Sequence, residues 1–456
     1  MQFRVAIKNL GKIEEAKVDI KPLTILVGKN SIGKSFITKS LYCILNTLNK
    51  NHIALEIQKL TEGIDGYFSY FYNLLSRKQK YDLDNIRFLN KVYIPFLNSV
   101  VDKIEDKNIF LTEKIIRENR EKFIELTSKL EKYIQRKKEL KNPSSKKRKR
   151  ILVLLKAKLD KLKRIFTNTR EILINQIGKY INTSFKKNFQ QKDIGTLIKI
   201  GSKKAIISLE NIGSVEIDID DKIMFKFLKE GIEEVGNLKN VVYLDSPVYL
   251  KLKKGLSRIK EPILFKEKLL KGYPLYIDEL FNFLDFELIE ENKIEFQKIS
   301  KHIQRIVNGK FQRNEIGDFE FIEKNEYKIP LSLLAMGVSN IALIEYLIRN
   351  NIISKGSFLI IDEPESHLHP QWQVELVDVL YKIAQNGANV IIATHSINII
   401  KAIEVIVRED EKAKDLIAIN KMPYSSEFQE KSIIGKIEES LKELTEPYSN
   451  LVWRIL

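Results

Sequence analysis

Two periods of hydrophobic and polar positions divide this chain of 456 residues into predicted strands and predicted helices. Short alternating runs, FRVAIKNL, EEAKVDI and LTILVG, predict strands within residues 1–50, and the segment after LTILVG has helical spacing. Period-two alternation returns in TLIKIGSKKAIISLENIGSVEIDID, and apolar runs in NVVYLDSPVY, SFLIID and NVIIATHS predict buried strands. Strands separated by helical segments predict an α/β fold.

Residues 51–184 have mainly helical spacing, and within 111–180 they follow a heptad pattern. The first apolar seam consists of Ile116, Phe123, Leu126, Leu130, Tyr133 and Leu140, and the second of Leu152, Leu155, Leu159, Leu162, Phe166 and Leu173. Between the seams, Asn142-Pro143-Ser144-Ser145 would break a helix. Two heptad arms around a break predict an antiparallel coiled-coil hairpin.

The positive charge of the chain is concentrated in this hairpin. The formal net charge is +17, and the 33 residues 132–164 contribute +13 of it, with 15 Lys or Arg and two acidic residues. The densest cluster follows the predicted break, at the tip of the hairpin, and consists of Lys146, Lys147, Arg148, Lys149 and Arg150. Such a cluster favours a nucleic-acid backbone or an acidic protein face as partner, and the alternative is a solvated charged tip without a ligand.

The composition is that of a globular protein, with 44% hydrophobic and 30% charged residues. No apolar run approaches the roughly 18–20 residues that would cross a bilayer. The first residues, MQFRVAIKNL, are too polar for a secretory signal. The single cysteine, Cys43, cannot form an internal disulfide, so we expect a cytoplasmic protein.

Candidate chemistry begins in ILVGKNSIGKSF, where the spacing Gly28-x4-Gly33-Lys34-Ser35 fits a phosphate-binding loop. The two glycines allow the backbone to wrap around a polyphosphate with its N–H groups pointing inward. Lys34 supplies a positive charge to the outer phosphates, and Ser35 supplies a hydroxyl for Mg²⁺. The loop leads into a predicted helix, whose N-terminus favours anions. The alternative is a glycine turn without a ligand.

Two further predicted strands end in residues suited to the same site. SFLIID ends in Asp362, a carboxylate that can hold Mg²⁺ directly or through its water shell. Glu363 follows it, points differently, and can orient or deprotonate an attacking water. NVIIATHS ends at Thr394-His395. Because ligands of doubly wound sheets bind at the C-terminal ends of strands, we expect these residues to meet there.

These motifs resemble those of non-transporter ABC-type ATPases, a branch that includes SMC, RecF and OLD-like proteins. The matching segments are GKNSIGKS (Walker A), LSLLAMGVS (signature-like), LIIDEP (Walker B), ESHLHPQWQ (D-loop region) and ATHS (H-switch), in the family's order. Within this branch the chain is most similar to the stand-alone ATPases of bacterial anti-phage systems such as Septu and PARIS. The resemblance implies a P-loop ABC ATPase core with a mostly parallel sheet and an N-terminal antiparallel sheet, interrupted by the helical insertion.

The resemblance also implies roles for single residues. Glu363 would be the catalytic carboxylate and His395 the switch that senses the γ-phosphate, while Ser35 and Asp362 would hold Mg²⁺. The residues implied in ATP binding are Gly28, Asn30, Gly33, Lys34, Ser35, Phe36 and Gly337. The alternative at His395 is a hydrogen-bonded core histidine. The alternative for His367 and His369, with Asp362 and Glu365 nearby, is a metal cluster, although HLHP is usual in the dimer-facing loop of this family.

Two segments depart from the family pattern. The signature motif usually has a serine before its glycines, whereas here Ala335 precedes Met336 and Gly337. A hydroxyl directed at the partner's ATP is therefore missing unless Ser332 or Ser339 replaces it, and a hydrogen bond to a charged group is worth about 1.5–3 kcal/mol. The expected Q-loop, NVVYLDSPVYLKL, contains no glutamine, and Asp245 is the candidate to replace it.

We expect three parts along the chain: an ATPase core of residues 1–50, 185–250 and 309–456, a helical insertion of 51–184, and a helical subdomain of 251–308. The resemblance implies that ATP joins subunits into a homodimer or higher homo-oligomer and is hydrolysed slowly. About 60 residues follow His395, fewer than the nuclease domain that OLD-like relatives carry there, so we expect a separate effector such as a nuclease.

These expectations favour a sensor-scaffold ATPase of a bacterial anti-phage defence system. The first alternative is a DNA-repair ATPase of RecF type, in which the basic hairpin tip holds DNA. The second alternative is a transporter ATPase subunit. The separation of 327 positions from Ser35 to Asp362 disfavours it, because transporter subunits are more compact.

Overall fold

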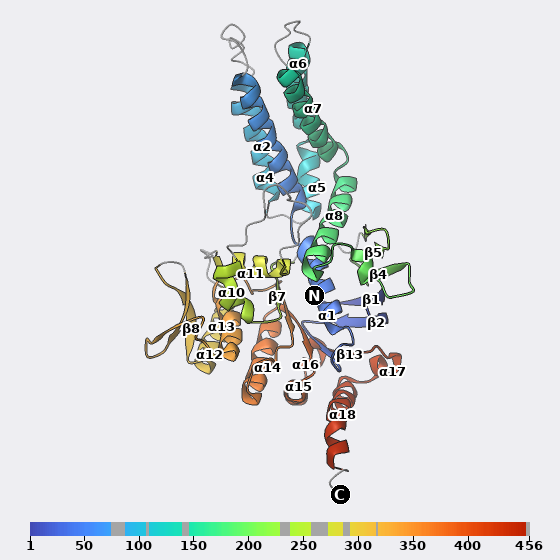
Figure 1. Ribbon diagram of the computed structural model, residues 1–456, viewed down its shortest axis with the longest axis vertical. Helices are drawn as coiled ribbons and strands as arrows, with labels where there is room; N and C mark the ends of the chain where they lie inside the picture. Colours follow the sequence, from blue (N-terminus) through green and yellow to red (C-terminus); the bar gives the residue numbers. More distant parts are fainter. Residues whose placement is uncertain are drawn as a thin grey trace. The chain divides into compact units, whose positions relative to one another are not determined.

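The structure, a computed structural model, describes residues 1–73, 87–105, 109–138, 146–228, 238–256, 272–285, 292–315 and 318–452 (Figure 1). The chain divides into two compact units. The first is discontinuous and comprises Met1–Asn49 and Tyr180–Leu456, and the second is Lys50–Lys179. In the described part of the chain, every β-strand belongs to the first unit.

The first unit contains a five-stranded parallel sheet in the order β13-β3-β12-β11-β7. Its strands are β3 (Leu23–Val27), β7 (Val241–Leu244), β11 (Phe358–Asp362), β12 (Asn389–Thr394) and β13 (Ile417–Lys421). Every residue of β3, β7, β11 and β12 is buried, because helices such as α1 (Lys34–Leu48) and α14 (Pro370–Gln385) pack against the sheet. Burial on both faces explains why these strands are continuous apolar runs in the sequence.

A second five-stranded sheet is antiparallel, in the order β2-β1-β4-β5-β6. Its strands are β1 (Phe3–Leu10), β2 (Ile13–Ile20), β4 (Lys204–Leu209), β5 (Gly213–Asp218) and β6 (Lys222–Phe227). Burial alternates along β4 and β5, as the period-two pattern predicts. The predicted fold class, a mostly parallel sheet with an N-terminal antiparallel sheet and a helical insertion, is confirmed.

Shorter elements complete the first unit. A three-stranded antiparallel sheet, in the order β10-β9-β8, consists of β8 (Gly309–Arg313), β9 (Phe319–Glu323) and β10 (Lys328–Pro330). The remaining helices are η3 (Ile194–Leu197), α10 (Val248–Leu256), α11 (Leu275–Asp285), α12 (Ile294–Ile306), α13 (Met336–Arg349), α15 (Ile397–Glu409), α16 (Ala413–Leu416), α17 (Ser426–Glu430) and α18 (Ile433–Val452).

A buried acidic side chain connects α12 with α13. Glu345 of α13 is fully buried and forms an ion pair with Arg349 at 2.9 Å. Its Oε1 also accepts hydrogen bonds from Ser300 at 2.9 Å and from Gln304 at 2.7 Å, both on α12. A buried carboxylate is tolerated only with such partners, so this group fixes how the two helices pack.

The second unit is helical. It contains α2 (His52–Asn73), the π-helix η2 (Leu89–Tyr93), α4 (Ile94–Ile104), α5 (Ile109–Glu118), α6 (Arg120–Lys138), α7 (Lys146–Thr167) and the first residues of α8 (Thr169–Phe189). Helices α6 and α7 pack together, and the rings of Phe123 and Phe166 stack with centroids 3.9 Å apart. The described members of both heptad seams are buried. Helix α2, which has no part in the seams, also packs against α7.

The predicted hairpin tip is described only in part. Leu140 and the predicted break at Asn142-Pro143-Ser144-Ser145 lie outside the described residues. Helix α7 begins at Lys146, and Lys147, Lys149 and Arg150 are exposed on its first turns. Within the described ranges, no helix combines the length and the apolar character that crossing a membrane requires.

Candidate nucleotide site

The phosphate-binding loop follows β3 directly and contains two backbone positions that favour glycine. Gly28 has a φ of 150°, and an ideal Cβ there would lie 2.4 Å from the carbonyl oxygen of Met422. Gly33 has a φ of 104° and precedes α1 without a side-chain hydrogen bond to the helix. The first N–H groups of this 15-residue helix therefore lack a side-chain cap, which suits a phosphate ligand.

The side chain of Lys34 lies inside this loop. It is buried, and its Nζ donates hydrogen bonds to the carbonyl oxygens of Gly28 and Lys29, both at 2.7 Å. Burial lowers the pKa of the Lys34 amine, and nearby carboxylates, Asp362 foremost, oppose that shift. The loop therefore surrounds a cationic group that polyphosphate oxygens can approach.

Asp362 ends β11 as a buried carboxylate with unused bonding capacity. Its Oδ2 accepts a hydrogen bond from the Tyr243 hydroxyl at 3.2 Å, whereas its buried Oδ1 has no hydrogen-bond partner among the described residues. Burial raises the pKa of Asp362, and the hydroxyls of Ser35 and Tyr243 oppose that shift. A buried carboxylate oxygen without a partner, close to a serine hydroxyl, fits Mg²⁺, which prefers oxygen ligands and retains several waters.

Glu363 lies one residue beyond the end of the strand and is more accessible than Asp362. Its φ is 53°, in the left-handed region, and its N–H donates to the carbonyl oxygen of Ala393 at 2.8 Å. The only hydrogen bond of its carboxylate found among the described residues is a long one, 3.5 Å, from Ser366 Oγ. This half-exposed carboxylate is available to orient a water molecule.

His395 follows β12 and lies next to Glu365, a residue to which the sequence pattern assigns no catalytic role. The two side chains approach to 3.2 Å between His395 Nδ1 and Glu365 Oε1. The parallel pairing of β11 with β12 places the segments after both strands at the same edge of the sheet. Strand β3, which precedes the Walker A loop, also pairs in parallel with β12. The structure therefore brings the Walker A, Walker B and H-switch candidates to one edge of the sheet.

The signature-like segment leads into α13. An ideal Cβ on Gly337 would lie 2.6 Å from the carbonyl oxygen of His367, so the start of α13 touches the D-loop region. Ala335, the residue before the helix, provides no side-chain cap. Ser339 Oγ donates to the carbonyl oxygen of Ala335 at 3.1 Å, whereas the side chain of Ser332 is exposed.

The other implied ATP-binding residues occupy different environments. Asn30 is exposed in the loop. The ring of Phe36 packs against Phe189 with centroids 5.4 Å apart, and it fills the space beside Gly11. A nucleotide contact from Phe36 would therefore come from its backbone.

The histidines of HLHP do not form a metal site with their neighbours. His369 caps α14, with its Nδ1 accepting a hydrogen bond from the Gln371 N–H at 3.3 Å. His367 is exposed. Across the ranges that the structure describes, no group of three or more His, Cys, Asp or Glu side chains is arranged to hold a metal ion.

The site is also supported by Tyr243 of β7 and Gln373 of α14, which the sequence pattern does not single out. Besides Asp362, the Tyr243 hydroxyl contacts Thr38 Oγ1 of α1 at 3.3 Å. Gln373 Nε2 donates to the carbonyl oxygen of Leu368 at 3.0 Å, and its Oε1 accepts from Ser396 Oγ at 2.7 Å. A tyrosine in a buried strand and a glutamine on a helix have no local signal, since their partners are remote in sequence.

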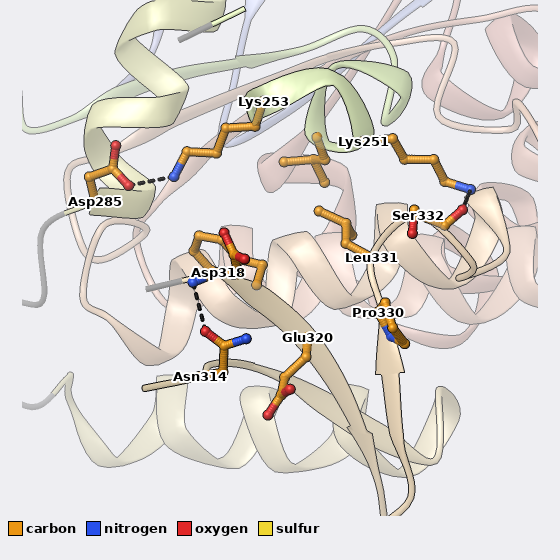
Figure 2. A pocket seen from close by; sticks show the side chains of 11 residues that line it. Lys251, Lys253, Asp285, Asn314, Asp318, Glu320, Pro330, Leu331 and Ser332 are labelled. Atoms are coloured by element: carbon orange, nitrogen blue, oxygen red, sulfur yellow. Dashed lines mark hydrogen bonds and ion pairs between the residues drawn. The ribbon is translucent and has the colours of Figure 1, made fainter. Parts of the chain in front are cut away.

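The candidate Q-loop residue Asp245 accepts a hydrogen bond from the Tyr276 hydroxyl. Burial raises the pKa of Asp245. Farther along the same segment, α10 borders a pocket of about 550 Å³ that Figure 2 shows beside the signature-like segment. In this pocket Lys251 Nζ donates to the carbonyl oxygen of Ser332 at 3.3 Å, which joins α10 to the residues before α13.

Residues 1–400 match the family described as AAA ATPase domain. The chain belongs to this family. Membership makes it an ATP-binding ATPase of AAA/ABC type and implies ATP, with Mg²⁺, as its ligands.

Among curated proteins, the chain is similar to the energy-coupling factor transporter ATP-binding protein EcfA2 of Mycoplasma mobile, with 29% identity over 196 residues. The alignment covers 42% of this chain and 55% of that relative, so this chain spans just over half of the relative's length.

Solved structures of SMC heads are also similar. The SmcHead bound to the C-winged helix domain of ScpA has 11% identity and a TM-score of 0.38, with 88% of this chain and 91% of that chain covered. The SMC head domain from Thermotoga maritima has 8% identity and a TM-score of 0.35, with 88% and 92% covered.

Proposed function

We propose that this chain is a slow ATPase whose ATP-bound form closes a homodimer or higher homo-oligomer through its nucleotide sites. The observation that carries the proposal is the buried Asp362 Oδ1, which has no hydrogen-bond partner among the described residues and belongs to a carboxylate close to Ser35. In this assignment Ser35 and Asp362 hold Mg²⁺, which when bound neutralises phosphate charge. Lys34 and the N–H groups at the start of α1 bind the outer phosphates.

The remaining residues act on the terminal phosphate. Glu363 orients or deprotonates the attacking water, because its carboxylate is accessible next to the buried Asp362. His395 contacts the γ-phosphate from the end of β12. Gly337 is the second residue of α13, whose uncapped N-terminus suits the phosphates of a partner subunit's ATP. Loss of the γ-phosphate would then release the partner.

The test compares Lys34→Ala with Glu363→Gln. Lys34→Ala should abolish binding of a fluorescent ATP analogue, whereas Glu363→Gln should bind ATP but hydrolyse it about 10²–10³ times more slowly. Light scattering after size exclusion, with ATP and Mg²⁺, should show Glu363→Gln trapped as a closed dimer. The exposed Lys12→Ala and Glu409→Gln serve as controls of matched charge. Full turnover by Glu363→Gln would remove Glu363 as the base.

We also propose that this ATPase acts in the cytoplasm as the sensor-scaffold of an anti-phage defence system and controls a separate effector such as a nuclease. The support is the similarity of its motifs to ATPases of systems such as Septu and PARIS. A host carrying the chain and its neighbouring genes should resist phage infection, and Lys34→Ala should remove the resistance. Unchanged resistance in that variant would contradict the role.

A second candidate function is a DNA-repair ATPase of RecF or SMC type. The observation in its favour is the exposed basic start of α7, with Lys147, Lys149 and Arg150. Binding of duplex DNA to the full chain, with an affinity that falls steeply with salt, would favour this candidate.

A further inference from the structure

Glu365 is a buried carboxylate that links the segments after β11 and β12. It is 8% exposed, and its Oε1 accepts two hydrogen bonds at 2.8 Å, from Thr394 Oγ1 and from the backbone N–H of His395. Thr394 is the last residue of β12, so Glu365 contacts the chain where the H-switch begins. Burial of a carboxylate is costly unless donors bond to it. The donors of Thr394 and His395 therefore stabilise Glu365 in this position.

Glu365 and His395 each have a buried polar atom without a hydrogen-bond partner among the described residues. Glu365 Oε2 is buried and has no hydrogen-bond partner among the described residues. His395 Nδ1 lies 3.2 Å from Glu365 Oε1 but is likewise without a hydrogen bond there. The imidazole side chain is 40% exposed. A small rotation of this ring would give Nδ1 a carboxylate acceptor while Nε2 remains on the exposed side.

Gln373 provides a second link between the same two segments. It bonds to the carbonyl oxygen of Leu368, in the loop after Glu365, and to Ser396 Oγ, next to His395. Gly337 of α13 touches the carbonyl of His367 in that loop. The loop that carries Glu365 is therefore held on both sides, and its carboxylate keeps a fixed position relative to His395.

We propose that Glu365 is the positioning residue of His395, accepting a hydrogen bond from Nδ1–H so that Nε2–H is presented to the γ-phosphate of ATP. This inference rests on the proposed function, in which His395 contacts that phosphate. A histidine that donates from both ring nitrogens carries both protons and a positive charge. The Glu365 carboxylate stabilises that charge. Other charged groups of the site are Lys34, Lys39, Asp362 and Glu363.

The first test separates positioning from simple support of the fold. Glu365→Gln retains a neutral acceptor for the Thr394 and His395 donors but removes the charge, and Glu365→Ala removes both. Glu365→Gln should lower kcat about 10- to 100-fold while leaving the Kd of a fluorescent ATP analogue and the thermal unfolding midpoint unchanged. Glu409→Gln, on the exposed end of α15, is the matched control and should behave as the wild type.

The second test asks whether Glu365 acts through His395. In a double-mutant cycle, adding Glu365→Gln to His395→Ala should cause no further loss of kcat, because the group that Glu365 positions is already absent. Independent fold-losses that multiply would overturn the proposal. So would full kcat in Glu365→Gln.

A third measurement does not depend on hydrolysis. With selectively ¹³C-labelled histidine and the non-hydrolysable analogue AMPPNP bound with Mg²⁺, the His395 ring at pH 7 should show the signature of the doubly protonated form in the wild type and lose it in Glu365→Gln. His395→Ala identifies the signal among the five histidines. The same histidine signal in the wild type and in Glu365→Gln would overturn the proposal. A signal that changes between them, in a wild type that does not hydrolyse ATP, would count against the proposed function alone.

Discussion

Replacing Gly337 with alanine should disturb the contact between the signature helix and the D-loop region. An ideal Cβ at this position would lie 2.6 Å from the His367 carbonyl oxygen and 3.2 Å from Leu368 Cδ2, whereas ordinary contacts are 3.4–4 Å. The added methyl group therefore requires one of the two segments to move by about 0.8 Å.

The D-loop region cannot yield easily, because its backbone is held at several points. The Leu368 N–H donates to the Glu365 carbonyl oxygen at 3.1 Å, and the Leu368 carbonyl accepts from Gln373 at 3.0 Å. Overpacking of this kind costs about 1–3 kcal/mol, and the better helix propensity of alanine offsets up to about 1 kcal/mol. We expect a net loss of about 1–2 kcal/mol, or roughly 1–3 °C in the thermal midpoint of a chain of this length.

The assay measures thermal unfolding and ATPase rate side by side, with Gly255→Ala as the control. Gly255 is also helical and belongs to the same unit, but no atom lies within 4 Å of its ideal Cβ among the described residues. Gly255→Ala should be neutral or stabilising, while Gly337→Ala should lower both the midpoint and the rate. A Gly337→Ala protein as stable and as active as the Gly255→Ala protein would refute the contact.

Three other changes test separate features. Ala335→Ser should raise turnover or tighten the ATP-bound dimer, and no change in either would mean that Ala335 does not face the partner's phosphate. Tyr243→Phe removes the donor to Asp362 and should raise the Mg²⁺ concentration needed for half-maximal ATPase; an unchanged Mg²⁺ titration would show that this hydrogen bond is dispensable. Glutamine at all five basic positions of the tip should spare ATPase but remove DNA or effector binding. If DNA is the partner, the affinity of the unchanged chain should fall with salt, with a log–log slope near −0.9 per phosphate neutralised. Retention of both kinds of binding in the variant would identify a solvated tip. These positions are Lys146, Lys147, Arg148, Lys149 and Arg150.

The parts that could be predicted from the sequence depend on neighbouring residues. Spacing alone locates the loop from Gly28 to Ser35, because the turn, the cation and the helix start are adjacent in the chain. The apolar run before Asp362 predicts a buried strand, and the structure has β11 there. The heptad seams likewise predict buried positions such as Phe123 and Phe166, since period and burial coincide along a helix.

The parts that could not be predicted depend on which remote residues meet. Glu365 bonds to a residue 30 positions later, and no period or motif identifies that pair. In the sequence, Tyr243 is one of several residues in an apolar strand. Only the pairing of β7 with β11 shows that its hydroxyl reaches Asp362. Glu345 is an acidic residue within an otherwise apolar stretch of α13, and its burial depends on the donors that α12 supplies.

The hydrogen bonds of Lys34 have a consequence for ligand selectivity. Because its ammonium group already donates to two carbonyl oxygens of its own loop, an incoming ligand must offer something stronger than a neutral dipole. Anionic phosphate oxygens do so, since their full negative charge attracts the ammonium group more strongly than the partial charge of a carbonyl oxygen does. A nucleoside without phosphates gains nothing from this exchange. The loop should therefore discriminate by the charge of the phosphate chain, and weakly by the identity of the base.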